Sequence, residues 1–314
     1  MIYNKMIYRD QFPLSMTKNF KNRIWNLQEK YTPYIFLLPF ILVFCTFMAY
    51  PLAKSIYMSF TCTNGPKSIV WIGLDNFIFL FKDKNFWTAV RNTFVFAAFS
   101  VFLQLPCSLG LAILVNKKWL KGKNIFRFSF FAPYLCGTVF VAVLFSVLLV
   151  PRFGLVNRAL HFITGYGLDL KWLGEASMVM PTLVLITLWL FTGFNMIYFI
   201  AALQSVDKGL YEAAEIDGAN SFQKFLHVTL PGIKPVAVFV VIMSTIGSLQ
   251  LFELPYVLLG GPGPNQAGLT IVMYLYQTGF ETGNLGYASA IGWVLVVIIM
   301  SVSLFQLWLG RSKK

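Results

Sequence analysis

Apolar and polar positions alternate along this chain in long blocks, and six apolar runs are separated by short polar connections. A hydrocarbon core of about 30 Å needs about 20 helical residues to cross it, and each run reaches that length. The pattern therefore predicts an all-α integral membrane protein with six transmembrane helices. The predicted helices are Tyr34–Phe60, Trp87–Val115, Phe128–Val150, Met178–Leu203, Pro235–Leu258 and Leu285–Leu309.

Lys and Arg residues indicate the orientation of these helices, because they accumulate in cytoplasmic connections. Seventeen lie in one alternating set of connections and six in the other, which predicts that both termini are cytoplasmic. The first 33 residues have no apolar signal-peptide core, so we expect the first helix to remain as an anchor. The expected organisation is a cytoplasmic tail over 1–33, the first helix and an outer loop over 34–86, a five-helix core over 87–309 and a cytoplasmic tail over 310–314.

Composition agrees with a membrane location and excludes one partner class. Charged residues make up 12% of the chain, against about 25% in soluble domains. The net charge of +13 comes from basic residues at the ends of apolar runs and not from one basic face. We therefore expect membrane lipids as neighbours and no nucleic acid.

The sequence contains no recognisable catalytic or metal-binding pattern. Its four cysteines form no CxxC pair, and its two histidines lie far apart without ligands at zinc spacing. The GxxxxGK[ST] phosphate-binding loop is absent. We therefore expect that the chain binds no metal or cofactor itself and catalyses no chemistry.

One polar stretch, residues 207–235, lies between the fourth and fifth predicted helices. Asp207 is a plausible N-cap for a short helix that ends near Ile216, and Gly218 can take the left-handed conformation that follows such a helix. Asn220 and Gln223 resemble a capping box for a second helix, which Pro231 and Pro235 are expected to stop. A solvated loop is the simpler alternative, but two capped helices favour an element that docks onto a partner.

Several polar or aromatic residues lie within the predicted spans. Amide, hydroxyl and aromatic side chains bind sugars, although buried amides also join helices for packing alone. Glu253 is the one carboxylate in a predicted span, about 27 Å along the helix from Pro235 and so near its outer end. It is a candidate for a substrate or gating role, or an interfacial residue. The candidate pathway residues are Gln104, Trp189, Thr192, Asn195, Gln250 and Glu253.

The central stretch also carries a family resemblance. Tyr211-Glu-Ala-Ala-Glu-Ile-Asp-Gly-Ala219, followed by Leu230-Pro231, resembles the EAA motif of membrane subunits of binding-protein-dependent ABC importers. Lys208-Gly209 departs from that pattern, in which a proline or an acidic residue opens the helix. Gly73-Leu-Asp-Asn-Phe77, Gly260-Gly-Pro262 and Gly286-Tyr-Ala-Ser-Ala290 are similar to the carbohydrate-uptake branch, which includes maltose, lactose and glycerol-phosphate permeases.

The resemblance implies a type I ABC importer transmembrane fold in the bacterial cytoplasmic (inner) membrane. It implies four partners: a homologous second permease, a cytoplasmic ABC ATPase dimer that binds ATP and Mg, an extracytoplasmic solute-binding protein, and a carbohydrate substrate. It also implies that the central stretch is a coupling helix docked on the ATPase. The residues that would couple are Tyr211, Glu212, Ala213, Ala214, Asp217, Gly218, Ala219 and Pro231.

Two other classes of protein remain as alternatives. A stand-alone secondary transporter or channel would place ionisable residues within the spans, and Glu253 is the nearest candidate. A membrane-embedded enzyme would cluster His, Asp or Glu at one membrane face. The acidic residues of the central stretch have only His227 nearby in sequence.

Overall fold

The computed structural model describes residues 14–63, 69–117 and 119–311. The first thirteen and last three residues, which belong to the two predicted cytoplasmic tails, lie outside the described residues. The chain divides into two compact units between Tyr57 and Met58. Five helical segments of the described chain are long and apolar enough to cross a membrane, or six if one bent pair counts as a single span.

The N-terminal unit is a run of helix. Helix α1 (Leu14–Phe44) passes through a π-helical turn, η1 (Cys45–Ala49), into α2 (Tyr50–Ser59). The π turn directly precedes Tyr50-Pro51. A proline ring clashes with the carbonyl group one turn back in a regular helix, and a wider turn makes room for it. The residues from Glu29 to Ser59 form the first candidate span.

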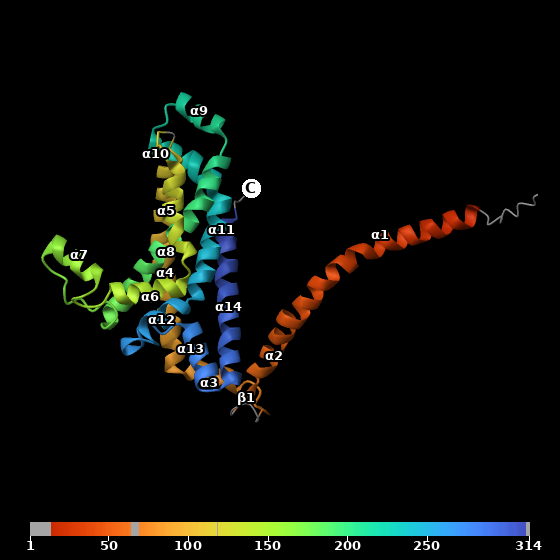
Figure 1. Cartoon of the computed structure of the whole chain (residues 1–314), viewed down its shortest axis with the longest axis horizontal. Coiled ribbons are helices and arrows are strands. Elements are labelled where there is room, and N and C mark those ends of the chain that lie inside the picture. The colour runs from red at the N-terminus through yellow and green to blue at the C-terminus, as the bar shows by residue number, and fades with distance from the viewer. Residues whose placement is uncertain (1–13, 64–68, 118, 312–314) are drawn as a thin grey trace, which may run out of the picture. The chain divides into compact units, whose positions relative to one another are not determined.

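Four long helices form the bundle of the C-terminal unit, α4 (Lys84–Asn116), α8 (Ala176–Ser205), α11 (Leu230–Leu249) and α14 (Leu285–Gly310) (Figure 1). Helix α8 packs against α4, α11 packs against both, and α14 packs on α11. Leu183, Leu190 and Met196 of α8 are fully buried. Helix α8 is therefore the centre of the bundle.

The third predicted span is not one continuous helix. It consists of α5 (Lys123–Leu135) and α6 (Thr138–Leu148), which meet at an angle of 91°. Gly137 at the bend has φ +74° and ψ 144°, a conformation that glycine adopts at little cost and that no helix contains. The prediction of a single helix over Phe128–Val150 was therefore wrong.

The fifth predicted span, Pro235–Leu258, lies within one candidate span, Ser221–Leu259, but its helix is interrupted near the end. Helix α11 ends at Leu249, and a separate short helix, α12 (Glu253–Leu259), follows. Pro255 explains the break, because in a continuous helix its ring would clash with the carbonyl group of Leu251, four residues earlier. That carbonyl group instead accepts a hydrogen bond of 2.7 Å from the hydroxyl group of Thr270.

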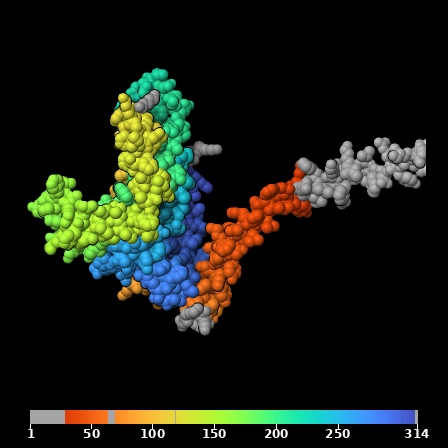
Figure 2. All heavy atoms as spheres, viewed as in Figure 1, coloured from red at the N-terminus to blue at the C-terminus, as the bar shows by residue number. Residues whose placement is uncertain are grey.

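The connections carry the remaining short elements. A small antiparallel hairpin pairs Thr61 with Trp71 and is an addition to the predicted all-α architecture. Figure 2 shows α6 and α7 as an arm that extends from the side of the bundle. These elements are β1 (Thr61–Thr63), β2 (Ile69–Trp71), α3 (Asp75–Lys82), α7 (Leu155–Thr164), α9 (Lys208–Ile216), α10 (Ser221–Lys224), η2 (Phe225–Thr229), η3 (Pro264–Gln266), α13 (Ile271–Tyr276) and η4 (Gln277–Glu281).

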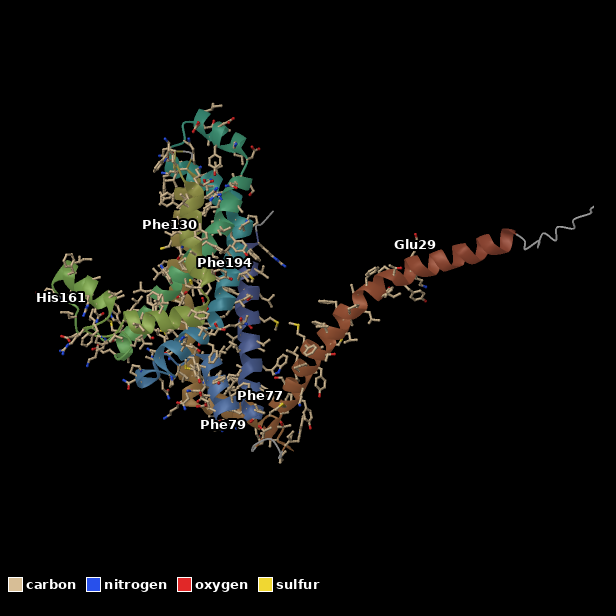
Figure 3. All side chains as sticks on the ribbon, in the orientation of Figure 1. Glu29, Phe77, Phe79, Phe130, His161 and Phe194 are labelled. Atoms are coloured by element: carbon tan, nitrogen blue, oxygen red, sulfur yellow. The ribbon has the colours of Figure 1, made fainter. Side chains whose placement is uncertain are left out.

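Gly193 of α8 lets α5 cross the bundle at very short range. A Cβ atom built on Gly193 would lie 1.8 Å from the carbonyl oxygen of Phe130. Figure 3 labels Phe130 on α5 and Phe194, the residue that follows Gly193, in the same part of the bundle. The absence of a side chain at Gly193 thus brings the end of α5, including Tyr134, against the middle of α8.

Candidate functional site: a coupling hairpin and an aromatic cavity

The polar stretch folds as a helical hairpin at one end of the bundle, opposite the end that holds α3 and α13 (Figure 1). The predicted N-cap of α9 is present, because the carboxylate of Asp207 accepts a hydrogen bond of 2.9 Å from the backbone N–H of Gly209. This cap compensates for the unusual Lys208-Gly209 opening.

The end of α9 is a Schellman motif around Gly218, which has φ +75°. The N–H of Ala219 donates to the carbonyl oxygen of Ala214 at 2.9 Å, and the N–H of Gly218 donates to that of Glu215 at 3.1 Å. The left-handed residue satisfies two free carbonyl groups and reverses the chain direction, as the sequence predicted.

The second helix begins with the predicted capping box. The Asn220 side chain accepts from the N–H of Gln223 at 2.9 Å, and the Gln223 side chain accepts from the N–H of Asn220 at 2.8 Å. Helix α10 does not stop at Pro231 or Pro235 as predicted. It continues through the π turn η2 into α11, since the wide turn makes room for the Pro231 ring that a regular helical turn would exclude.

Two side-chain contacts hold the hairpin closed. The hydroxyl groups of Tyr211 and Thr229 lie 2.9 Å apart, and Lys224 forms an ion pair of 2.5 Å with Glu215. The hydrogen bond and charge of Lys224 lower the pKa of the Glu215 carboxyl below its usual value. The two arms of the hairpin therefore form one folded unit.

The outer surface of the hairpin combines carboxylates with exposed apolar side chains. Glu212 and Asp217 are exposed, and among the described residues neither side chain has a hydrogen-bond or ion-pair partner. Ile216 is 87% exposed and Phe222 is 69% exposed. Exposed apolar groups rimmed by charge are typical of protein interaction sites. Of the other predicted coupling residues, Ala213 and Pro231 are exposed, while Tyr211, Ala214 and Ala219 are half-buried.

A cavity of about 550 Å³ lies within the bundle, between α4, α5, α8, α11 and α12. Four of the six predicted pathway residues line it, namely Gln104, Asn195, Gln250 and Glu253. The amide of Asn195 donates to the hydroxyl group of Ser244 at 3.2 Å, which links α8 to α11 across the cavity wall. The structure thus brings together polar side chains from α4, α8, α11 and α12.

Trp189 and Thr192 are not among the residues that line this cavity. The Trp189 ring packs edge-on against Phe145 with their centroids 5.6 Å apart. The Thr192 hydroxyl donates to the backbone carbonyl of Leu188 in its own helix. Both side chains are engaged in packing or local hydrogen bonding in this structure.

The cavity also has an aromatic wall that residue types alone did not reveal. The rings of Tyr134 and Phe194 stack with centroids 4.3 Å apart, Phe194 meets Tyr198 at 5.3 Å, and Tyr198 meets Phe239 at 5.8 Å. The helical spacing of Phe191, Phe194 and Tyr198 on α8 was a signal that could have predicted one face of this wall.

The break between α11 and α12 positions Gln250 and Glu253 at the cavity. Gln250 follows the last residue of α11 and Glu253 opens α12, so both stand beside non-helical backbone at the cavity. Irregular backbone is tolerated at membrane depth where it borders protein or a water-filled space.

Among the described residues, no group of three or more His, Cys, Asp and Glu side chains could hold a metal ion.

The fold matches two solved structures of one transport system. One is a bacterial ABC transporter involved in the import of the acidic polysaccharide alginate, with a TM-score of 0.81, 28% identity, and coverage of 92% of this chain and 98% of that one. The other is a bacterial alginate ABC transporter in complex with an alginate pentasaccharide-bound periplasmic protein, with a TM-score of 0.79, 26% identity, and coverage of 92% and 97%.

Sequence comparison gives the same result. The arabinooligosaccharides transport system permease protein AraP of Bacillus subtilis is 38% identical over 91% of this chain and 90% of its own length. The lactose transport system permease protein LacF of Rhizobium radiobacter is 33% identical over 90% and 94%. The family model described as "Binding-protein-dependent transport system inner membrane component" matches residues 30–314. This chain is therefore a multi-pass membrane permease that belongs to the family of binding-protein-dependent transport system inner membrane components.

Proposed function

We propose that this chain forms one half of the pathway through which an ATP-driven ABC importer takes up a carbohydrate. The observation that carries the proposal is the cavity, which joins an aromatic wall around Phe194 to the amides of Asn195 and Gln250. Aromatic faces cover the apolar face of a sugar ring, and amides bond its hydroxyl groups. The transport of sugars by AraP and LacF supports the same substrate class.

We propose that a homologous second permease forms the other half of this pathway. A solute-binding protein would deliver the substrate on the outer side, which is consistent with the periplasmic protein bound to the alginate transporter. The membrane would be the bacterial inner membrane. Both termini would be cytoplasmic, with tails over 1–33 and 310–314, an anchor helix and outer loop over 34–86, and the core over 87–309.

The hairpin of α9, α10 and η2 is proposed to couple the pathway to a separate ATPase dimer, which holds ATP and Mg. Exposed Glu212 offers a carboxylate to a basic group of that partner, and Ala213 lets the partner approach closely. Because η2 continues into α11, movement of the hairpin would be transmitted to the helix that carries Ser244 and borders the cavity. A stand-alone transporter would not need an exposed, folded surface for a partner protein. The presence of this surface therefore favours the importer.

The proposed coupling can be tested on the assembled transporter. The chain is co-expressed with the ATPase and permease genes of its genomic neighbourhood, with and without Glu212→Lys combined with Gly218→Pro. We expect the ATPase to copurify with the native chain and to be lost with the double variant. Glu175→Lys reverses an exposed charge far along the chain from the hairpin and serves as the control. Retention of a fully active ATPase by the double variant would overturn the coupling role.

A further inference from the structure

Glu253 gives the cavity a single unbalanced charge. Its side chain is exposed, lines the cavity and has no hydrogen-bond or ion-pair partner among the described residues. A carboxylate beside apolar and aromatic lining residues costs free energy unless it meets water, a cation or hydrogen-bond donors. The structure holds Glu253 there by the break in the fifth span, so its position follows from Pro255 and from the bond between Thr270 and Leu251.

No described residue that lines the cavity is basic. The lining contains Ser, Thr, Asn, Gln, Tyr and apolar side chains, and Glu253 is its one charged member. Arg91, the nearest basic residue to the cavity-lining part of α4 in sequence, is exposed and is not part of the lining. A cavity with low-dielectric walls focuses the field of such a charge, so the interior is electronegative.

We propose that this cavity admits uncharged saccharides and excludes anionic ones, and that Glu253 is the residue that sets this preference. The proposal rests on the proposed function and narrows its substrate class. Sugar hydroxyl groups donate to a carboxylate in strong, charge-assisted hydrogen bonds. A uronate, sulfonate or phosphate group would meet a like charge with no cation of this chain to offset it. The predicted selectivity thus differs from that of the structurally similar transporter of acidic alginate.

The negative potential inside the cavity can be measured with charged reagents that modify thiols. In the assembled transporter with Cys45, Cys62, Cys107 and Cys136 changed to Ser, Met243→Cys places a thiol on an exposed position of the cavity lining. Two methanethiosulfonates are compared, one with a trimethylammonium group and one with a sulfonate group. We expect the cationic reagent to react faster than the anionic one. We expect Glu253→Gln to lower the ratio of the cationic to the anionic reaction rate about tenfold. Glu281→Gln, which removes an exposed carboxylate outside the lining, should leave the ratio unchanged.

Selectivity is measured by protection of the same thiol from an uncharged reagent. Maltotriose is expected to protect it and trigalacturonate is not, whereas Glu253→Lys should allow trigalacturonate to protect. The proposal is overturned if trigalacturonate protects the native cavity as well as maltotriose does, or if Glu253→Gln leaves the ratio of rates unchanged.

These outcomes are separate from a failure of the proposed function. If thiol modification at position 243 leaves ATP-driven uptake intact, the cavity is not the pathway, even where the charge preference is as expected. If modification blocks uptake and the charge preference is missing, the pathway stands and the role of Glu253 fails.

Discussion

The hydroxyl groups of Tyr211 and Thr229 lie 2.9 Å apart and join α9 to the π turn that leads into α11. Thr229 is buried and Tyr211 is half-buried, so water has limited access to this bond. The contact ties α9 to the π turn at the base of α11. Under the proposed coupling role, transmission of movement from the hairpin to the cavity should depend on this contact.

Tyr211→Phe is expected to loosen the hairpin without unfolding the bundle. A lost hydrogen bond between neutral groups costs about 1 kcal/mol, which should speed hydrogen exchange of the Gly218 and Ala219 amides about fivefold. Transport per ATP should fall for the same reason. Tyr166→Phe, which alters an exposed tyrosine of the connection between α7 and α8, is the control. Unchanged amide exchange in Tyr211→Phe would show that the bond does not hold the arms together.

Gly193→Ala is expected to prevent correct packing of α5 on α8. The added methyl group would lie 1.8 Å from the Phe130 carbonyl oxygen, a backbone atom that cannot rotate away. We expect a loss of about 3 kcal/mol or more, visible as a lower thermal transition in detergent and poor recovery of folded protein. Gly110→Ala is the matched control, because nothing lies within 4 Å of its Cβ position and it is also within a helix. That control should be neutral or stabilising by about 0.5–1 kcal/mol.

The Glu215–Lys224 ion pair predicts a pH dependence of the hairpin. Lys224 lowers the pKa of Glu215, so the pair stabilises the hairpin fully above the ordinary glutamate value of 4.5 and loses that effect as the pH falls through the lowered value. Amide exchange at Gly218, corrected for its intrinsic rate, should accelerate over that acidic range and at high salt. The effect should be small because Glu215 is exposed. Glu215→Gln should abolish the pH dependence, and an identical profile in that variant would assign it to another group.

Asp83 is expected to stabilise the end of the bundle that lies opposite the hairpin. Its carboxylate accepts hydrogen bonds from the hydroxyl groups of Tyr274 and Tyr287, the latter at 2.7 Å, and also caps α4 through the N–H of Asn85. Burial and this carboxylate raise the pKa of Tyr274 to about 12, so its hydroxyl group stays a donor at physiological pH.

Asp83→Ala should therefore lower the free energy of unfolding by about 3 kcal/mol, and Asp83→Asn should recover part of the loss because its single side-chain oxygen can still cap α4, while its NH2 group cannot accept from the tyrosines. Thermal unfolding of the purified chain measures both. Asp75→Ala changes an exposed residue in the first turn of α3. It should lower the free energy of unfolding by less than about 1 kcal/mol, because a surface charge near a helix N-terminus contributes about that much or less. Equal losses at the two positions would contradict the role of Asp83.

The sequence by itself determined the features that depend on neighbouring residues. Apolar runs long enough to cross a bilayer predicted the spans, and the Asp207 cap, the Gly218 reversal and the Asn220–Gln223 capping box were readable because each bond joins residues at most five positions apart. The chemistry of such bonds is contained in a short stretch of chain.

Tertiary structure decided what depends on distant partners. At the break before Glu253, the carbonyl group of Leu251 needs the hydroxyl group of Thr270, which is distant in sequence, as its hydrogen-bond donor. Pro255 is a local signal for this break, but the continuous apolar run around it favoured a single helix. The aromatic wall joins residues of α5, α8 and α11, and membrane helices show few periodic differences between faces because lipid and protein neighbours are both apolar. The sequence therefore marks which segments cross the membrane. Their packing alone determines which side chains meet inside it.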